Sequence, residues 1–304
     1  MTAVLEAPLA IERATPRELL VRQTWGTLLR FALADWLCIG LAWLVLARAV
    51  EGPWAAVTVP ALILLIAGRL HALGILTHDA AHMPLARGPG LWLLEALIAH
   101  PVSTTIPAMR YHHSRHHAAR DFADDPYVLR ARPGRPLLNL LLSARGLLIP
   151  VVWGLRPALG LLALACPRLR NAWARVFLME RSGRDVTRDR EVATCLRAEP
   201  RQLASQALVL ALLIAFPGPV LLGWVLPLLV AGALVGTRLL AEHEAREGPA
   251  PRGEWHLDAR DHHTGFLGQL LVAPHWSGLH RAHHLHPQVA CQALPALGAH
   301  LARR

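Results

Sequence analysis

Histidine is concentrated in four short motifs of this chain. Of its 18 histidines, ten lie in the segments HDAAH, HHSRHH, LLAEHEA and HRAHH. The first segment begins at His78, the second at His112 and the fourth at His280, and the third holds the single His243. Neutral imidazole is a ligand of zinc, copper, iron and nickel, so this clustering predicts a transition-metal site.

The spacing within the motifs is that of a helix face. Side chains three and four residues apart on a helix lie side by side, with their Cβ atoms roughly 5 to 6 Å apart. His78 and His82 are four apart, and the second and fourth motifs each contain an HxxHH triplet. These triplets are His113, His116 and His117, and His280, His283 and His284. Each motif can therefore direct its rings to one point.

The number of histidines exceeds what one zinc ion takes, since zinc is usually satisfied by four ligands. Two six-coordinate irons offer about twelve positions, and nine imidazoles leave about three for water, oxygen or a bridge. Open positions indicate catalysis, while a non-redox membrane protein that binds zinc remains the alternative. Isolated histidines are expected to be structural or exposed; these are His71, His100, His256, His275, His286 and His300. His262 and His263 form a possible accessory pair, which we do not expect to bind the metal.

The composition predicts an all-α integral membrane protein. Hydrophobic residues make up 54% of the chain and charged residues 17%, and the mean hydropathy is +0.34. Two long apolar runs, broken at Glu51-Gly52-Pro53 and at Pro217-Gly218-Pro219, predict two transmembrane hairpins over about 27–76 and 200–240. We therefore expect four crossings in a single domain over 27–304, preceded by a cytoplasmic arm over 1–26. No signal-peptide pattern opens the chain.

Arginine sets the expected orientation, because short loops rich in basic residues stay on the cytoplasmic side. The two hairpin turns carry no basic residue, whereas the segment between Arg110 and Arg201 and both chain ends are rich in arginine. All four histidine motifs are then predicted on the cytoplasmic side, within a cap of interfacial helices that includes 91–99 and 137–165. An odd number of crossings between Asp121 and Leu240 would separate HRAHH from the other motifs.

These motifs resemble the histidine boxes of the membrane fatty-acid desaturase superfamily, a non-haem di-iron group. HDAAH is similar to the first box, RYHHSRHH with the following DDPY to the second, and HRAHHLHPQV with LPAL to the third. AEH is similar to the extra histidine between the second and third boxes, and the resemblance spans about 73–297. Animal acyl-CoA members carry an asparagine one turn before that histidine, where this chain has Leu239. The iron ligands that the resemblance implies are His78, His82, His113, His116, His117, His243, His280, His283 and His284, with His112 left over.

Carboxylates beside the boxes are candidates for orienting the ligands. A ligating histidine generally donates its other ring N–H to a carboxylate or carbonyl, which fixes its tautomer. The candidates are Asp79, Asp124, Asp125 and Glu242. Asp125 precedes Pro126, so turn formation explains that residue equally well.

The resemblance implies activation of dioxygen, as co-substrate, at two irons that cycle between Fe²⁺ and Fe³⁺. The expected reaction introduces a C=C bond into a fatty-acyl chain of a lipid. The alternative on the same site is a hydroxylase or ketolase acting on an acyl chain, a carotenoid or another apolar molecule. No nucleic acid partner is expected, and we expect a multi-pass protein of the cytoplasmic (inner) membrane with its site on the cytoplasmic side.

Electrons for this reaction are expected from a separate protein. The four cysteines, Cys38, Cys166, Cys195 and Cys291, have no iron–sulfur spacing and are expected to be reduced thiols, and no GxGxxG fingerprint is present. The resemblance implies an external donor of the ferredoxin, rubredoxin or cytochrome b5 type with its reductase. The net charge of +10 suits an acidic carrier, and anionic lipid equally.

Overall fold

The computed structural model describes residues 15–84, 88–119, 125–244 and 259–303. Within these ranges the chain forms helices and short helical turns, and its only extended pairings are isolated bridges such as that between His243 and Ala259. The predicted all-α fold is confirmed for this part of the chain. Part of the expected N-terminal arm, 1–14, lies outside the described residues.

The first predicted hairpin is formed by α2 (Trp25–Ala49) and α3 (Ala55–Ala81). The Thr24 hydroxyl accepts a hydrogen bond from the Thr27 backbone N–H at 3.2 Å, which begins α2. One side of α2 carries exposed leucines, and Leu44 is 70% exposed. A row of exposed leucine on a long helix is what a lipid environment favours over water.

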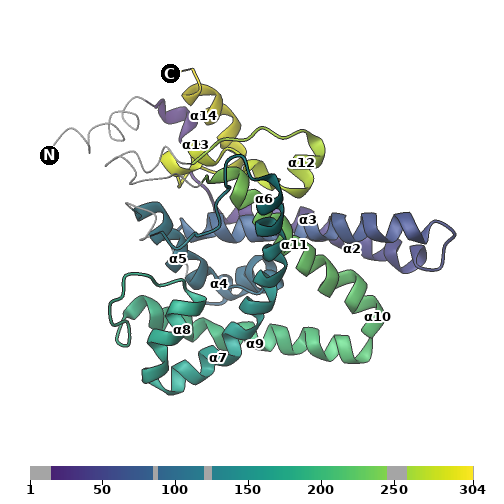
Figure 1. Ribbon diagram of the computed structural model, residues 1–304, viewed down its shortest axis with the longest axis horizontal. Coiled ribbons are helices and arrows are strands. Elements are labelled where there is room, and N and C mark those ends of the chain that lie inside the picture. The colour runs from purple at the N-terminus through teal and green to yellow at the C-terminus, as the bar shows by residue number, and fades with distance from the viewer. Residues whose placement is uncertain (1–14, 85–87, 120–124, 245–258, 304) are drawn as a thin grey trace.

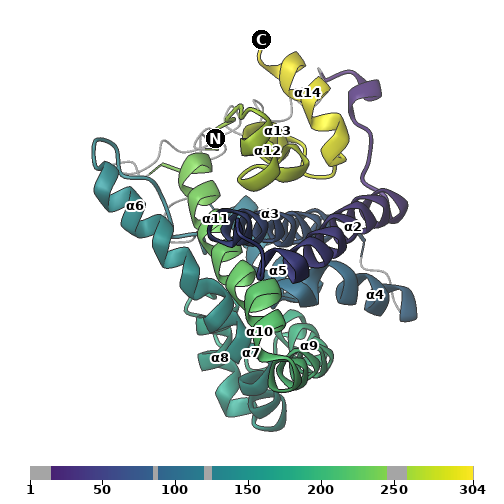
Figure 2. The ribbon, with the colours of Figure 1, turned by 90° about the vertical axis from the view of Figure 1, so that its right-hand side faces the viewer.

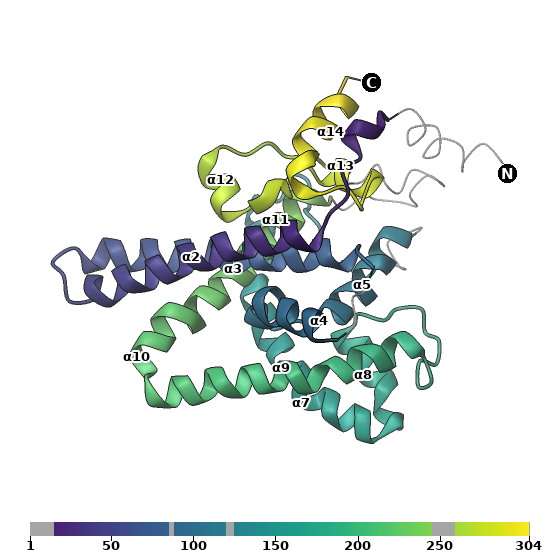
Figure 3. The ribbon, with the colours of Figure 1, turned by 180° about the vertical axis from the view of Figure 1, so that it is seen from behind.

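The second predicted hairpin is built from α9 (Arg190–Ala215), α10 (Pro217–Val220) and α11 (Leu226–Glu242). A π-helical turn, η6 (Leu221–Val225), joins the last two. Proline has no N–H to continue a helix but suits the first helical position, so the Pro-Gly-Pro sequence places the corner between α9 and α10. Figures 1 and 3 show this corner and the α2–α3 turn on the same side of the molecule, away from the C-terminal helices.

Four segments are long and apolar enough to cross a membrane: Trp25–Ala49, Ala55–Ala81, Pro136–Ala165 and Pro217–Glu242. Three of them match predicted crossings. The fourth, Pro136–Ala165, covers the region that the sequence assigned to the interfacial cap, while α9, expected to cross, is not among the four. The first half of α9 carries Arg197, Glu199 and Arg201, so its apolar part is short.

Length and composition select Pro136–Ala165 and not the predicted α9 for this crossing, whereas the direction of the two segments favours α9. The segment Pro136–Ala165 contains α6 (Pro136–Ala144), η4 (Arg145–Leu148) and α7 (Ile149–Ala165). Figures 1 and 3 show this segment running across the direction of α2 and α3, whereas α9 runs alongside them. Figure 2, which looks along that direction, shows α9 nearly end-on. The arrangement follows the predicted hairpin geometry, although α9 alone does not reach the apolar length of the others.

Short helices complete the described chain. Near the first hairpin these are η1 (Arg17–Leu19), α4 (Pro89–Leu94), the π turn η2 (Glu95–Ala99), η3 (His100–Val102) and α5 (Ile106–Ala118). Between the long segments lie η5 (Pro167–Leu169) and α8 (Arg170–Phe177). The C-terminal part holds α12 (Phe266–Leu271), η8 (Pro274–Trp276), α13 (His280–Leu285), η9 (Cys291–Ala293) and α14 (Leu294–Leu301). The helix expected over 91–99 is thus present as α4 and η2.

Helix α3 is the centre of the fold. It packs against α2, α5, α11 and α12, and Ile66, Leu70 and Leu73 on it are fully buried. Helix α11 also contacts η4 at Gly232 and Gly146. The two backbones lie so close there that a Cβ atom added to either glycine would overlap the carbonyl oxygen of the other. Such contacts between small residues let membrane helices approach closely. The helices that end in HDAAH and at His243 also pack directly against each other.

Candidate metal centre

The four histidine motifs lie at helix ends that meet at one place. HDAAH closes α3, the second motif fills the last turns of α5, His243 follows α11, and HRAHH opens α13. Because α3 and α11 both run from the hairpin tips toward these motifs, they deliver their histidines to the same end of the molecule. The Thr105 hydroxyl accepts a hydrogen bond from the Ala108 N–H and begins α5, which sets the register of its histidines.

Eight of the nine predicted ligands form two groups, in each of which the candidate ligand atoms lie within 4.8 Å of one another. The first histidine group contains His78, His82, His113 and His283. The second histidine group contains His116, His243, His280 and His284. Each group combines residues from at least three segments, so neither exists before the chain folds.

The Nε2 atoms point inward. His82 and His113 bring theirs to 2.8 Å, and His280 places its own 3.0 Å from those of His243 and His284. Imidazole nitrogens that face one another at this distance can bind the same cation. Such a cation would accept the lone pairs of all four rings. The buried, all-nitrogen donor set therefore fits a first-row transition metal at each group.

His117, the ninth predicted ligand, lies between the groups. Its Nε2 is 3.0 Å from that of His113 in the first group, and its ring stacks on His284 of the second with centroids 4.2 Å apart. The structure therefore brings all nine predicted histidines together, eight as two groups and His117 at their junction.

Burial keeps these imidazoles in the neutral form that binds metals. It lowers the pKa of the His82 ring to about 3. It also lowers the pKa well below the usual value in His113, His243, His280, His283 and His284. A neutral ring does not have to lose a proton before it binds a metal, so these histidines are ready to bind a metal at neutral pH.

Three of the four predicted carboxylates contact ligand histidines. Asp125, fully buried, lies 2.9 Å from His116 Nδ1, and Asp79 lies 3.1 Å from His78 Nδ1. Glu242 approaches His280 Nδ1 at 3.7 Å, which is too long for a hydrogen bond. In the Asp125 and Asp79 pairs the carboxylate faces Nδ1 and leaves Nε2 for the metal, which is the arrangement that fixes a ligand tautomer. Asp124 lies outside the described residues.

Several residues around the histidines were not predicted. The Tyr127 hydroxyl lies 3.2 Å from His113 Nδ1, and the Tyr127 ring stacks on His116. Arg130 pairs with Asp125, and the Gln23 amide donates to Asp79 at 3.2 Å. Tyr127 is the last residue of the DDPY segment and Arg130 follows it closely, so their proximity to the second box was the available signal. Gln23 has no sequence signal, because it reaches the site from the start of α2.

The remaining histidines of the described chain belong to neither group. His112 is buried beside a cavity, and His263 is exposed, as expected for a residue outside the centre. His262 is half-buried. Four histidines expected to be structural are buried or paired: His71 and His100 are buried, His275 contacts Asp35 at 2.9 Å, and His286 contacts Thr15 at 3.3 Å. His256 lies outside the described residues.

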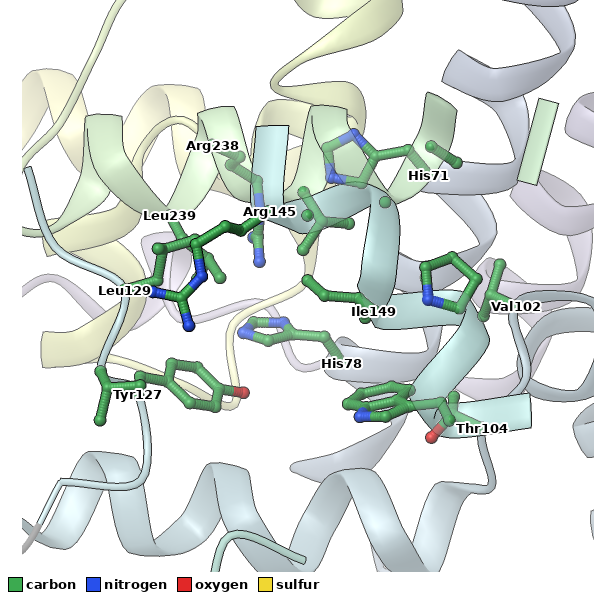
Figure 4. A pocket seen from close by; sticks show the side chains of 18 of the residues that line it. His71, His78, Val102, Thr104, Tyr127, Leu129, Arg145, Ile149, Arg238 and Leu239 are labelled. Carbon is green, nitrogen blue, oxygen red and sulfur yellow. The ribbon is translucent and has the colours of Figure 1, made fainter. Parts of the chain in front are cut away.

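A cavity of about 560 Å³ opens beside the first histidine group. His78 forms part of its wall, and most of the lining is apolar, including Ile75, Ile149 and Leu228. Figure 4 shows His78 facing the same space as Tyr127 and Ile149. Ligand cavities are typically concave, largely apolar and of this size. An apolar molecule bound here would lie against the first group.

Fold and site together define a helical membrane protein with a prepared metal centre beside an apolar cavity. A sequence model described as Fatty acid desaturase matches residues 52–304, a region that includes all four histidine motifs. The chain therefore belongs to the fatty acid desaturase family, and with it to the multi-pass membrane oxidoreductases. No curated protein matches the chain.

Proposed function

We propose that this protein is an oxygen-dependent di-iron oxidoreductase that desaturates a fatty-acyl chain of a lipid. The observation that carries the proposal is the pair of four-histidine groups lying against the wall of an apolar cavity. Bound iron would supply oxygen activation, the chemistry that removes hydrogen from an unactivated CH₂. The proposed iron ligands are the nine clustered histidines, His117 included.

The protein's own part is to hold ligands and substrate. Asp125 accepts from His116 Nδ1–H and is itself anchored by the Tyr127 backbone N–H at 2.7 Å. That chain of contacts keeps the His116 Nε2 lone pair directed into the second histidine group. The apolar cavity excludes water and aligns a hydrocarbon chain along the first group, so that one part of the substrate faces His78.

Hydroxylation or ketolation of an apolar substrate uses the same parts. Which product forms depends on whether a second hydrogen is removed or oxygen is transferred after the first hydrogen is lost. We keep desaturation as the proposal and treat oxygen addition as the other outcome of the experiment below.

The proposed setting is the cytoplasmic membrane, with the site on the cytoplasmic side and a single domain over 27–304 following a cytoplasmic arm. Electrons are proposed to come from an external ferredoxin, rubredoxin or cytochrome b5 type donor with its reductase. Both hairpin tips point away from α13, which carries the HRAHH motif (Figure 1), and this supports a common side for all four motifs.

Expression in a bacterial host of known lipid composition, together with a matched electron donor, tests the proposal. Mass spectrometry should find lipids lighter by two hydrogens in cells with the wild-type chain and none with His116→Ala. His263→Ala, which changes an exposed histidine outside both groups, is the matched control and should retain the product. Oxygen-containing lipids without loss of hydrogen would establish the hydroxylase alternative. One zinc and no iron in the purified protein would refute the di-iron site.

A further inference from the structure

The apolar cavity contains polar atoms that nothing in the described chain satisfies. They belong to His71, His112 and Arg238, which all line the cavity and are at most 6% exposed. His71 and His112 lie outside both histidine groups, so metal binding does not account for them. A buried polar atom without a partner is unfavourable, and in native structures it indicates a missing ligand or water.

His71 presents a hydrogen-bond acceptor to the cavity. Its Nδ1 lies 2.9 Å from the Leu271 backbone carbonyl, which can only accept, so Nδ1 carries the hydrogen. In a neutral imidazole the other nitrogen is then an acceptor. That atom, Nε2, is buried without a partner among the described residues. The carbonyl of Leu271 thereby fixes the tautomer that faces the cavity.

Arg238 presents donors to the same space. Its Nη1 lies 3.3 Å from Glu242, but its Nε–H has no acceptor in the described chain. Figure 4 shows the Arg238 and His71 side chains on the cavity wall above Ile149. An acceptor and a charged donor therefore face one region of the cavity.

His112 supplies a further polar point. Both of its ring nitrogens are buried without a hydrogen-bond partner, and its ring lies between Tyr127 and Trp153, with centroids 5.6 and 5.7 Å away. A neutral ring offers one donor and one acceptor. His112 follows Tyr111 and precedes the ligand His113, so its place beside the metal centre is fixed by α5.

A hydroxyl group matches this arrangement. It donates one hydrogen bond, as His71 Nε2 requires, and accepts another, as Arg238 can supply. A carboxylate only accepts, so it leaves His71 Nε2 unpaired, and a plain methylene chain satisfies none of these atoms. We propose that the substrate of this cavity is an apolar chain or ring that already carries a hydroxyl group, and that His71, together with Arg238, determines this specificity. The proposal rests on the proposed function, because it names the substrate class of the same site.

Position along α3 relates this polar region to the metal centre. His71 precedes His78 by seven residues, or about 10 Å at 1.5 Å per residue. The hydroxyl would therefore be held roughly two helical turns from the wall where the first histidine group lies. Binding should consequently favour one position of the hydroxyl on a chain.

Equilibrium binding to the iron-loaded protein in detergent tests the proposal without requiring turnover. The probes are palmitic acid and its isomers with a single hydroxyl at successive mid-chain carbons, each competing with a fluorescent fatty acid. One isomer or a few adjacent isomers should bind about tenfold or more tightly than palmitic acid. Equal affinity of all isomers and palmitic acid would overturn the proposal and would mean that water alone satisfies these atoms.

Variants assign the preference to His71. His71→Asn keeps a donor for the Leu271 carbonyl but removes Nε2, so it should reduce the preference about tenfold. His71→Gln places an amide oxygen near the position of Nε2 and should restore part of it. His263→Asn is the matched control and should change nothing. Iron content must match the wild type in all variants; a preference that persists in His71→Asn would refute the assignment.

The two proposals fail separately. A hydroxyl preference in binding, without any oxidised product from cells, would leave the cavity assignment standing and contradict the oxidase. A product formed from plain acyl chains, without a binding preference, would do the reverse.

Discussion

The two histidine groups have similar ligands but different surroundings. In the first group His78 forms part of the cavity wall and His82 is only partly buried. In the second group every imidazole is buried, and His116 is held by the fully buried Asp125. Asp79, the corresponding partner of His78, is 12% exposed.

This difference supports a division of work between the two proposed metals. A metal in the first histidine group would meet the substrate, since the cavity reaches that group through His78. A metal in the second would be enclosed by protein and held in place by an ion-paired carboxylate. Enclosed ligands with fixed partners lose little mobility on metal binding, which favours tight retention.

The largest expected effect comes from removing one ligand from either group. His113→Ala and His280→Ala should each lose about one iron per chain and lower product formation at least about a thousandfold, because the paired site no longer forms. Metal analysis of the purified variants, with product measured in the same host, checks this. Loss of both irons from a single substitution would show that the groups are not separate sites.

The next effect should separate the two carboxylates. Asp125→Asn removes the charge that His116, Arg130 and the Tyr127 N–H share, and we expect a 10- to 100-fold loss of iron affinity. Asp79→Asn should cost less, on the order of a few fold, because water can replace the more exposed carboxylate. Iron titration of both iron-free variants gives the comparison, and equal losses would contradict the difference between the groups.

Acid should weaken both groups. Burial lowers the pKa of ligands in each, including His113 and His280, below the usual value of 6.5. Below about pH 6.5 the unfolded chain therefore takes up protons that the folded chain does not, so folded stability falls as pH falls and is constant above that value. The unfolding temperature of the iron-free protein should drop by on the order of 5 °C between pH 7.5 and 5.5. A temperature that is independent of pH would be inconsistent with neutral buried rings.

The smallest effect is expected from Tyr127→Phe. This change removes the hydroxyl beside His113 Nδ1 but keeps the ring that stacks on His116. Product formation should fall by less than about tenfold with iron content unchanged, since one neutral hydrogen bond is worth about 1 kcal/mol. Loss of iron in this variant would mean that the hydroxyl, rather than the aromatic ring, secures the ligand.

Local spacing made the metal centre predictable to a large extent. His78 and His82 lie on one helix turn, and the two HxxHH triplets are visible as letters, so their convergence required only that the helices end at one place. Gln23 could not be found this way, because its contact with Asp79 depends on how separate segments pack. His71 was taken as structural, since an isolated histidine carries no pattern, and only the cavity reveals its unpaired nitrogen.

The number of membrane-spanning segments could be predicted from the sequence more readily than which helices form them. The first hairpin and the Pro217 corner follow from apolar length and proline. Apolar length does not decide whether Pro136–Ala165 or α9 crosses the membrane, because it cannot distinguish a helix that crosses from one that lies across its neighbours. That distinction depends on which surfaces pack, such as α7 against α9.

The backbone contact between Gly146 and Gly232 limits the width of the cavity. Both residues line it, and neither has a side chain to keep η4 and α11 apart. Any larger residue at either place would force η4 and α11 apart, because its Cβ would overlap the facing backbone. The two missing side chains thus limit the width of the cavity, and Gly232→Ala is expected to change which molecules fit beside the metal centre.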